Sequence, residues 1–217
     1  MTASERSGEV SLLHEQRQVA RDRIERAARQ VLADKGIGAT VEDVAAEARV
    51  SIRTVFRHYG TRDHMIASAL GSQLSHYSDT LPVPEDGATL ESWLPELLRE
   101  VHRVNALLGR AYWEMAALGD TLTGEVGAVA AQRLAGRNRF VNVVARGAWR
   151  LAGHRTRPPS WLVDLFAIHL SAFTTRELVS DFGRSVDDVA SMSSRVLIAA
   201  VRSVSPNCSA PRLRSAP

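Results

Sequence analysis

Apolar residues recur at helical spacing near the start of the chain. Between Ser11 and Lys35 they fall at i, i+3, i+4, i+7 and i+8, which is the pattern of one buried face of an α-helix. The residues with this spacing are Ile24, Ala27, Ala28, Val31 and Leu32. Gly36 and Gly38 follow and are expected to end the helix. Residues 1–10 are small and polar, so we expect a disordered tail there.

Two short helices separated by a tight turn are predicted between Thr40 and Gly60. Thr40 and Ser51 can cap these helices, because a hydroxyl can accept a hydrogen bond from the backbone N–H two or three residues later. Asp43 stands three residues after Thr40, as the acid of a capping box does. Gly60 is expected to end the second helix, and Thr61 to cap a longer one.

The second short helix has an apolar side and a basic side. Val55, Phe56 and Tyr59 have the spacing of a buried stripe. Four residues then lie near or on the opposite face: Ile52, Arg53, Thr54 and Arg57. A helix held in this way fits the major groove of DNA, where base edges can be distinguished. For any single arginine a solvated helix face is the alternative, and only the combined pattern favours DNA.

The polar residues of this segment match the chemistry of a DNA duplex. Arg53 can make a bidentate contact to guanine, and Thr54 can touch a base or a thymine methyl group. Arg57 can reach a base or a phosphate. His58 and Arg62 follow where the DNA backbone would pass, and Arg62 lies in the first turn of its helix, where free N–H groups favour a phosphate.

The same stretch resembles the N-terminal domain of the TetR family of transcriptional regulators. The resemblance covers roughly residues 20–70 and rests on Arg23–Ile24, Ala27–Ala28, Gly36, Thr40-Val-Glu-Asp-Val-Ala45, Ala48-Arg-Val-Ser51, Thr54-Val-Phe-Arg-His-Tyr59 and Thr61-Arg-Asp63. It implies an all-helical homodimer whose N-terminal helix-turn-helix domain binds DNA and whose C-terminal domain binds a small effector. It also implies base reading by Ser51, Ile52, Arg53, Thr54 and Arg57, and phosphate contacts from Thr40, His58 and Arg62.

Three positions depart from the family pattern. Arg49 stands where the turn usually has glycine, so a positive φ there would strain the backbone modestly. Phe56 replaces a common tyrosine, which removes a phosphate-binding hydroxyl, and its ring is expected to lie in the core. Arg62 replaces a frequent lysine and keeps the charge.

The rest of the chain is also expected to be helical, giving an all-α fold of about nine helices. Helices are expected over 61–78, from 88 onward, and over 106–118, 121–152, 160–182 and 186–204, with a break at 81–87. If Ser92 caps the helix that follows 88, Pro95 falls in its first turn, whereas a start at Leu90 would kink it. Ser185 and Asp188 form another expected capping pair.

We place a DNA-binding domain at residues 1–67, an effector-binding and dimerisation domain at 68–205, and a tail at 206–217. The family resemblance places the dimer interface on helices 160–182 and 186–204. Two such helices from each subunit would form a four-helix bundle about a two-fold axis.

Apolar and aromatic residues of the C-terminal half are candidates for lining an effector cavity. They are Val101, Trp113, Met115, Phe140, Val144, Phe166, His169 and Phe173. Ordinary core packing is the commoner role of such side chains, and His169 is the most pointed polar candidate among them. If the cavity exists, its lining suits a hydrophobic or aromatic compound. The histidines show no paired metal-ligand spacing.

Composition narrows the class of protein further. With 217 residues, 45% hydrophobic and 24% charged, the chain is typical of a globular protein with a sizeable core. Net charge is only +3, so the local cluster Arg49–Arg62 is what indicates nucleic acid. A single cysteine, Cys208, excludes an internal disulfide. The absence of a signal peptide and of a long apolar run favours a cytoplasmic protein with no membrane segment.

These observations favour a ligand-responsive transcriptional regulator, with a repressor as the preferred interpretation. It would bind a near-palindromic operator as a homodimer, be released by a hydrophobic or aromatic effector, and need no cofactor or metal. A DNA-binding regulator or architectural protein without an effector is the alternative. An enzyme is disfavoured, because no nucleophile–base pair, phosphate-binding loop or metal spacing is present. Activator against repressor stays open.

Overall fold

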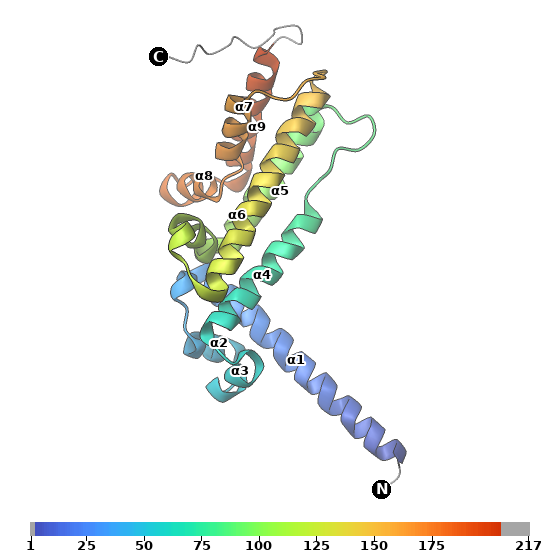
Figure 1. The fold of residues 1–217 in the computed structure, drawn as a ribbon, viewed down its shortest axis with the longest axis vertical. Coiled ribbons are helices and arrows are strands. Elements are labelled where there is room, and N and C mark those ends of the chain that lie inside the picture. The colour runs from blue at the N-terminus through green and yellow to red at the C-terminus, as the bar shows by residue number, and fades with distance from the viewer. Residues whose placement is uncertain (1–2, 205–217) are drawn as a thin grey trace. The chain divides into compact units, whose positions relative to one another are not determined.

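The computed structural model describes the backbone of residues 3–204 and the side chains of residues 18–74 and 81–204. Within this part of the chain there are nine α-helices, three short helical turns and no strands (Figure 1), which confirms the all-α prediction. The expected C-terminal tail and Cys208 lie outside the described residues. Among the described helices, none is both long and apolar enough to cross a membrane.

The chain divides into two compact units. The first combines residues 1–76 with 108–132, and the second combines 77–107 with 133–217. Helices α4 (Arg62–Thr80), α5 (Leu90–Leu118) and α6 (Gly124–Leu151) each contribute to both units. The expected boundary between residues 67 and 68 separates a DNA-binding domain from an effector-binding domain, so it divides the chain by function and not by packing. It stays a prediction.

The first unit is built on a helix that carries the predicted apolar stripe. Helix α1 (Ala3–Lys35) is followed by the 3₁₀ turn η1 (Gly36–Gly38) and by the short helices α2 (Val41–Ala48) and α3 (Ile52–Tyr59). The stripe is buried as predicted: Ile24, Ala27, Ala28, Val31 and Leu32. Helix α1 begins at Ala3 rather than at Ser11, so the disordered tail expected over residues 1–10 is wrong from Ala3 onward; Ala3, Glu5, Arg6 and Glu9 all have high helix propensity.

The second unit has its own apolar core. Its helices α7 (Ser160–His169) and α9 (Val186–Ser203) pack against each other, as Figure 1 shows. Fully buried side chains from four helices meet in this core: Leu94, Leu98, Ala145, Leu162, Phe166 and Leu197. The capping box predicted for Ser185 and Asp188 is present at the start of α9.

The start of the helix after residue 88, for which the sequence offered two alternatives, is Leu90: the Thr89 hydroxyl accepts from the N–H of Ser92, and Pro95 lies inside α5. The helix expected over 106–118 is joined to it, with one non-helical residue at Gly109. One expected helix is wrong. The helix expected over 160–182 is interrupted after α7 and continues as α8 (Ala172–Arg176) and a π-helical turn, η3 (Glu177–Asp181). The cause is Ser171, whose extended backbone and side-chain bond to the N–H of Phe173 start a new helix.

Candidate nucleic-acid interface

Helix α2 begins with the predicted capping box. The Thr40 hydroxyl accepts from the N–H of Asp43 at 3.2 Å, and the Asp43 carboxylate accepts from the N–H of Thr40 at 3.1 Å. Lys35 also pairs with Asp43 at 2.5 Å. The hydrogen bonds from Lys35 and Thr40 hold the pKa of Asp43 below its usual value, so the cap is charged at neutral pH.

The turn between α2 and α3 is left-handed at a residue other than glycine. Arg49 has φ 53° and ψ 48°, and it is the one non-glycine residue with positive φ in the described part of the chain. The strain expected at this position is therefore present. Arg23 of α1 braces the turn, donating from Nε to the Ala48 carbonyl at 3.1 Å and from Nη2 to the carbonyls of Ala48 and Arg49. These bonds connect α1 to the turn between α2 and α3.

Helix α3 is anchored on one side and open on the other. Ser51 caps it by accepting from the N–H of Thr54 at 3.2 Å. Val55 is 1% exposed and Tyr59 7%, so these two side chains fix the buried face. Arg53 and Arg57 are exposed, and neither forms a hydrogen bond or ion pair with any described side chain. Both guanidinium groups are thus available to a ligand outside the protein.

Phe56 does not lie in the core, contrary to the prediction from its spacing. Its side chain is 45% exposed, and Ile52, one turn earlier, is 42% exposed. Residues 100° apart on a helix place Phe56 at the margin of the stripe formed by Val55 and Tyr59, where the packing of a helix of eight residues ends. The outer surface of α3 therefore carries an apolar edge beside its arginines.

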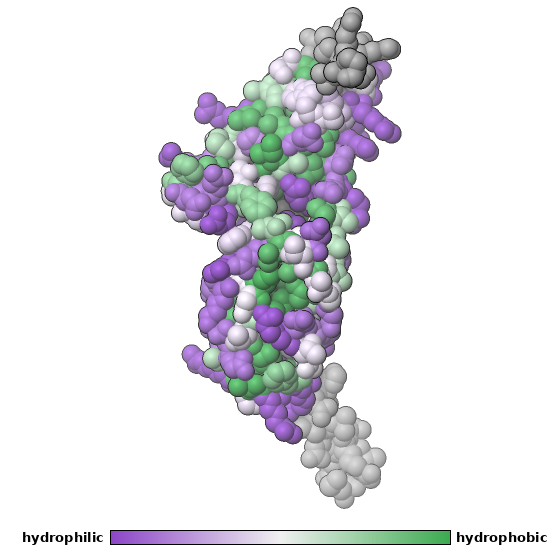
Figure 2. Space-filling view, turned by 60° about the vertical axis from the view of Figure 1, so that its left-hand side comes forward, coloured by the Kyte–Doolittle hydropathy of each residue, from purple (hydrophilic) through white to green (hydrophobic). Residues whose placement is uncertain are grey.

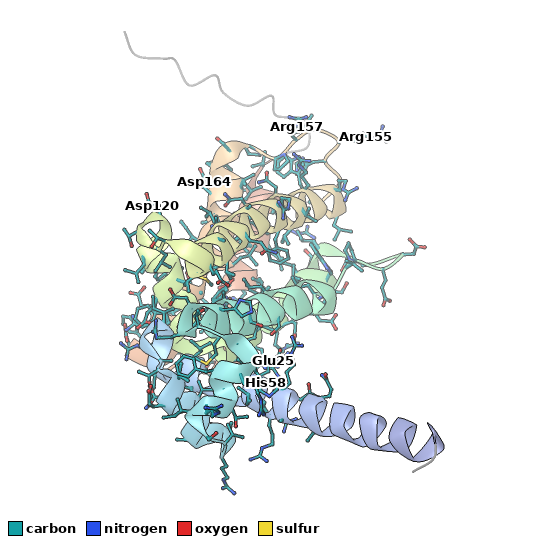
Figure 3. All side chains as sticks on the ribbon, turned by 60° about the horizontal axis from the view of Figure 1, so that its bottom comes forward. Glu25, His58, Asp120, Arg155, Arg157 and Asp164 are labelled. Carbon is teal, nitrogen blue, oxygen red and sulfur yellow. The ribbon has the colours of Figure 1, made fainter. Side chains whose placement is uncertain are left out.

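His58 is turned partly into the protein. Its Nε2 is buried and lacks a hydrogen-bond partner in the described structure. Burial, together with the positive charges of Arg57 and Arg21, lowers the pKa of His58, so the ring is neutral at pH 7. Figure 3 shows His58 on the side of α3 that faces α1. A phosphate contact from this residue, which stays a prediction, would have to come from Nδ1 and would be uncharged.

Arg62 is engaged within its own unit. Its Nε donates to the Ala39 carbonyl at 2.8 Å, and its Nη2 donates to the Ile37 carbonyl. Asp63 lies 3.4 Å from the third nitrogen. The guanidinium therefore connects the start of α4 to the segment between α1 and α2. The predicted phosphate contact of Arg62 would have to use the N–H groups of its guanidinium that do not donate to Ala39 or Ile37.

A second connection reaches the same segment from the C-terminal part of α5. The Glu114 carboxylate accepts from the N–H of Ile37 at 2.9 Å and from Arg110 at 2.5 Å. Ile37 is thus held through its N–H by Glu114 and through its carbonyl by Arg62. Near the start of α4, His64 and the Glu125 carboxylate of α6 form a further hydrogen bond at 2.6 Å. These bonds hold in place the segment that precedes α2 and the start of α4, which follows α3.

The candidate effector residues do not all lie in one unit. Trp113 and Met115 belong to the first unit, and the other six belong to the second. In the second unit Val101, Val144 and Phe166 are core residues, and Phe140 packs against that core from a half-buried position. Phe173 is 44% exposed.

A buried polar cluster in the second unit was missed by the sequence reasoning. His102 and Asn105 of α5 are both buried, and each lies against the Thr175 hydroxyl of α8, at 2.8 Å from His102 Nδ1 and 3.1 Å from Asn105 Nδ2. That hydroxyl also donates to the Ser171 carbonyl at 3.2 Å. The available signal was a histidine and an asparagine three residues apart within an otherwise apolar helix face.

Counting protons assigns a role to each atom of this cluster. The single hydroxyl proton of Thr175 goes to Ser171, so all three contacts are satisfied only if Asn105 and His102 Nδ1 donate to Thr175. His102 Nε2 is then a bare acceptor, and it is buried with no described partner. Burial, with His169 nearby, lowers the pKa of His102 to about 4, so this ring is neutral at pH 7.

His169, the polar candidate from the sequence, lies close to this cluster. Its Nδ1 is 3.1 Å from the buried Ser193 hydroxyl of α9, and burial lowers its pKa as well. The two sets of contacts therefore join α5 to α8 and α7 to α9. Among the described side chains, no three His, Cys, Asp or Glu residues gather as metal ligands would.

Helices α7 and α9 leave apolar side chains in contact with solvent. Trp161, Ile168, Met192 and Val196 are each 40% to 58% exposed. Figure 2 shows apolar surface among polar residues in the upper half of the view, where these helices lie. Ile168 follows Trp161 by two helical turns, and Val196 follows Met192 by one, so each pair lies on one side of its helix. This surface is defined by those four residues.

Comparison with known proteins identifies relatives for part of the chain. The sequence pattern of bacterial regulatory proteins of the TetR family matches residues 24–69, which contain η1, α2, α3 and the adjoining parts of α1 and α4. An HTH-type transcriptional repressor of Streptomyces coelicolor is 33% identical over 94 residues. That match covers 42% of this chain and 47% of the repressor, so the chain spans about half the length of this curated relative.

Proposed function

Because this chain belongs to the TetR family of bacterial regulatory proteins, we propose that it is a transcriptional repressor that binds DNA as a homodimer and releases it on binding a small effector. The observation that carries the proposal is the exposed basic side of α3. Arg53 and Arg57 project from a helix whose opposite side is fixed by Val55 and Tyr59. An α-helix presented in this way fits the major groove.

Arginine geometry supports base reading by this helix. A guanidinium with free donors can make two parallel hydrogen bonds to O6 and N7 of guanine. The hydroxyls of Ser51 and Thr54 lie 2.8 Å apart at the start of α3, next to the helix N-terminus. Thr40 and Ser51 are the N-terminal caps of α2 and α3. The backbone N–H groups at the start of a helix favour a phosphate. Together these groups supply both base and backbone contacts.

The exposed apolar surface of α7 and α9 supports the proposed dimer. Trp161, Ile168, Met192 and Val196 would be removed from water if the same two helices of a second copy packed on them. On DNA, the two copies of α3 in a dimer would have to enter successive major grooves on one side of the duplex, one helical turn of about 34–36 Å apart. The operator would then be a near-palindrome.

The buried polar cluster supports an effector site in the second unit. His102 Nε2 is a buried acceptor without a described donor, and Leu98 and Val101, which precede it on α5, belong to an apolar core of a kind that would suit a hydrophobic or aromatic compound. A hydroxyl or N–H group on that compound would satisfy it, since an unpaired buried polar atom costs about 1–3 kcal/mol. The effector would favour the conformation in which it binds more tightly, and DNA would be released if that conformation fits the operator poorly.

The DNA part of the proposal is tested with a duplex selected by the protein from random sequences. Arg53→Ala should lose its preference at one base pair in each half-site, at a cost of about 1–3 kcal/mol. Arg139→Ala, which changes an exposed arginine of α6 in the second unit, is the matched control and should bind as the unmodified protein does. Fluorescence anisotropy on the selected duplex and on single-base variants gives both affinities. Equal losses from the two variants would contradict the role given to α3.

The effector part is tested by release of the same duplex. A set of hydrophobic and aromatic compounds is titrated into the protein–DNA complex, and anisotropy reports free DNA. Compounds that release DNA from the unmodified protein should act at least tenfold less strongly on His102→Leu, whose second unit offers no acceptor at this position. If no compound releases DNA, the alternative of a regulator without an effector is supported instead.

A further inference from the structure

Beside its buried side and its basic side, helix α3 has an exposed apolar edge, and no group on DNA has yet been named as the partner of this edge. Arg53 and Arg57 point away from the buried pair Val55 and Tyr59. At 100° per residue, Thr54 lies on one flank of the arginines, and Ile52 and Phe56 lie on the other. A single exposed apolar side chain needs no explanation, but these two form a continuous edge beside the arginines.

The chemistry of this edge selects one partner on DNA. Phe56 has no hydroxyl, so it cannot donate to a phosphate as a tyrosine at this position can. Ile52 is aliphatic and likewise offers nothing to the charged backbone. The major groove displays one apolar group, the C5-methyl of thymine, and apolar side chains are its usual partners.

We propose that Ile52 and Phe56 read thymine methyl groups beside the guanines contacted by Arg53 and Arg57. The inference rests on the proposed DNA-binding function and adds the operator chemistry. Four residues along a helix span roughly 6 Å, and base pairs along a strand are about 3.4 Å apart. The two side chains therefore reach methyl groups at most about two base-pair steps apart. Each operator half-site should contain thymine within this distance of a guanine.

The test replaces single thymines of the selected duplex by deoxyuridine, which removes the methyl group and leaves all hydrogen bonds unchanged. Affinity should fall about fourfold at each contacted thymine, since a buried methylene group contributes about 0.8 kcal/mol. Phe56→Ala should bind the thymine and deoxyuridine duplexes equally at one of these positions, and Ile52→Ala should do so at another. Phe56→Tyr keeps the ring and should keep the sensitivity to the methyl group.

Phe182→Ala is the matched control, because Phe182 is 62% exposed in the second unit. It should leave the response to deoxyuridine unchanged. A duplex that binds with unchanged affinity after every deoxyuridine substitution overturns this inference and leaves the DNA-binding proposal standing. The inference is also overturned if replacing each thymine by deoxyuridine lowers the affinity of Phe56→Ala as much as that of the unmodified protein. If the unmodified protein selects no duplex at all, the proposed function fails, and the inference fails with it.

Discussion

Substituting Gly109 by alanine tests the packing of the first unit directly. Gly109 has φ 62° and ψ −151°, a conformation that is essentially restricted to glycine and costs other residues about 1–3 kcal/mol. A β-carbon at this position would also lie 2.5 Å from the carbonyl oxygen of Ala33 and 2.7 Å from its Cα, both backbone atoms of α1. Overpacking of this kind costs roughly a further 1–3 kcal/mol. Gly109→Ala should therefore lower the free energy of unfolding by about 2–6 kcal/mol.

The same substitution at Gly136 provides a control of opposite sign. Gly136 lies inside α6, and a β-carbon there would have no atom within 4 Å. Gly136→Ala should raise the free energy of unfolding by about 0.5–1 kcal/mol, because alanine loses less conformational freedom in a helix. Urea unfolding followed by far-ultraviolet circular dichroism measures both. A neutral or stabilising Gly109→Ala would refute the conformation described for α5.

Three further changes test other parts of the structure. Arg23→Met removes the hydrogen bonds to the carbonyls of Ala48 and Arg49 and should cost about 1–3 kcal/mol in urea unfolding, where an unchanged stability would argue against the brace. Ser185→Ala removes a capping box and should cost about 1 kcal/mol by thermal unfolding, whereas Ser185→Asp, which keeps an acceptor, should cost less. The lowered pKa of His102 means that the unfolded chain binds more protons than the folded one between pH 6.5 and about 4, so stability should fall as pH is lowered through that window. The loss should be at most about 1.4 kcal/mol per pH unit, and His102→Leu should reduce this slope.

Local signals made most of the first unit predictable from the sequence. A cap acts on N–H groups two or three residues away, so Thr40, Ser51 and Thr61 mark the starts of their helices without any tertiary information. The stripe on α1 follows from periodicity in the same way. Phe56 shows the limit of this reasoning, because in a helix of eight residues the edge of the buried face depends on which neighbours reach it.

Contacts between distant residues could not be read from the sequence. The Arg62 guanidinium is bound to carbonyls more than twenty positions earlier, so its position in the first turn of α4 suggested only a phosphate contact. Thr175 lies about seventy positions after His102 and Asn105, and no periodicity links the three. The break at Ser171 also escaped prediction, because a serine next to a helical pattern starts a new helix only when the chain has room to turn there.

The most direct test of the proposed role of α3 is the salt dependence of binding to the selected duplex. Arg53→Ala/Arg57→Ala should bind at least tenfold more weakly than the unmodified protein and show a shallower fall of log K with log salt concentration, since two guanidinium contacts are lost. The control Arg139→Ala/Arg150→Ala alters two exposed arginines of α6 and should keep both the affinity and the slope. Binding by the α3 variant with the same affinity and the same slope as the unmodified protein would contradict the account.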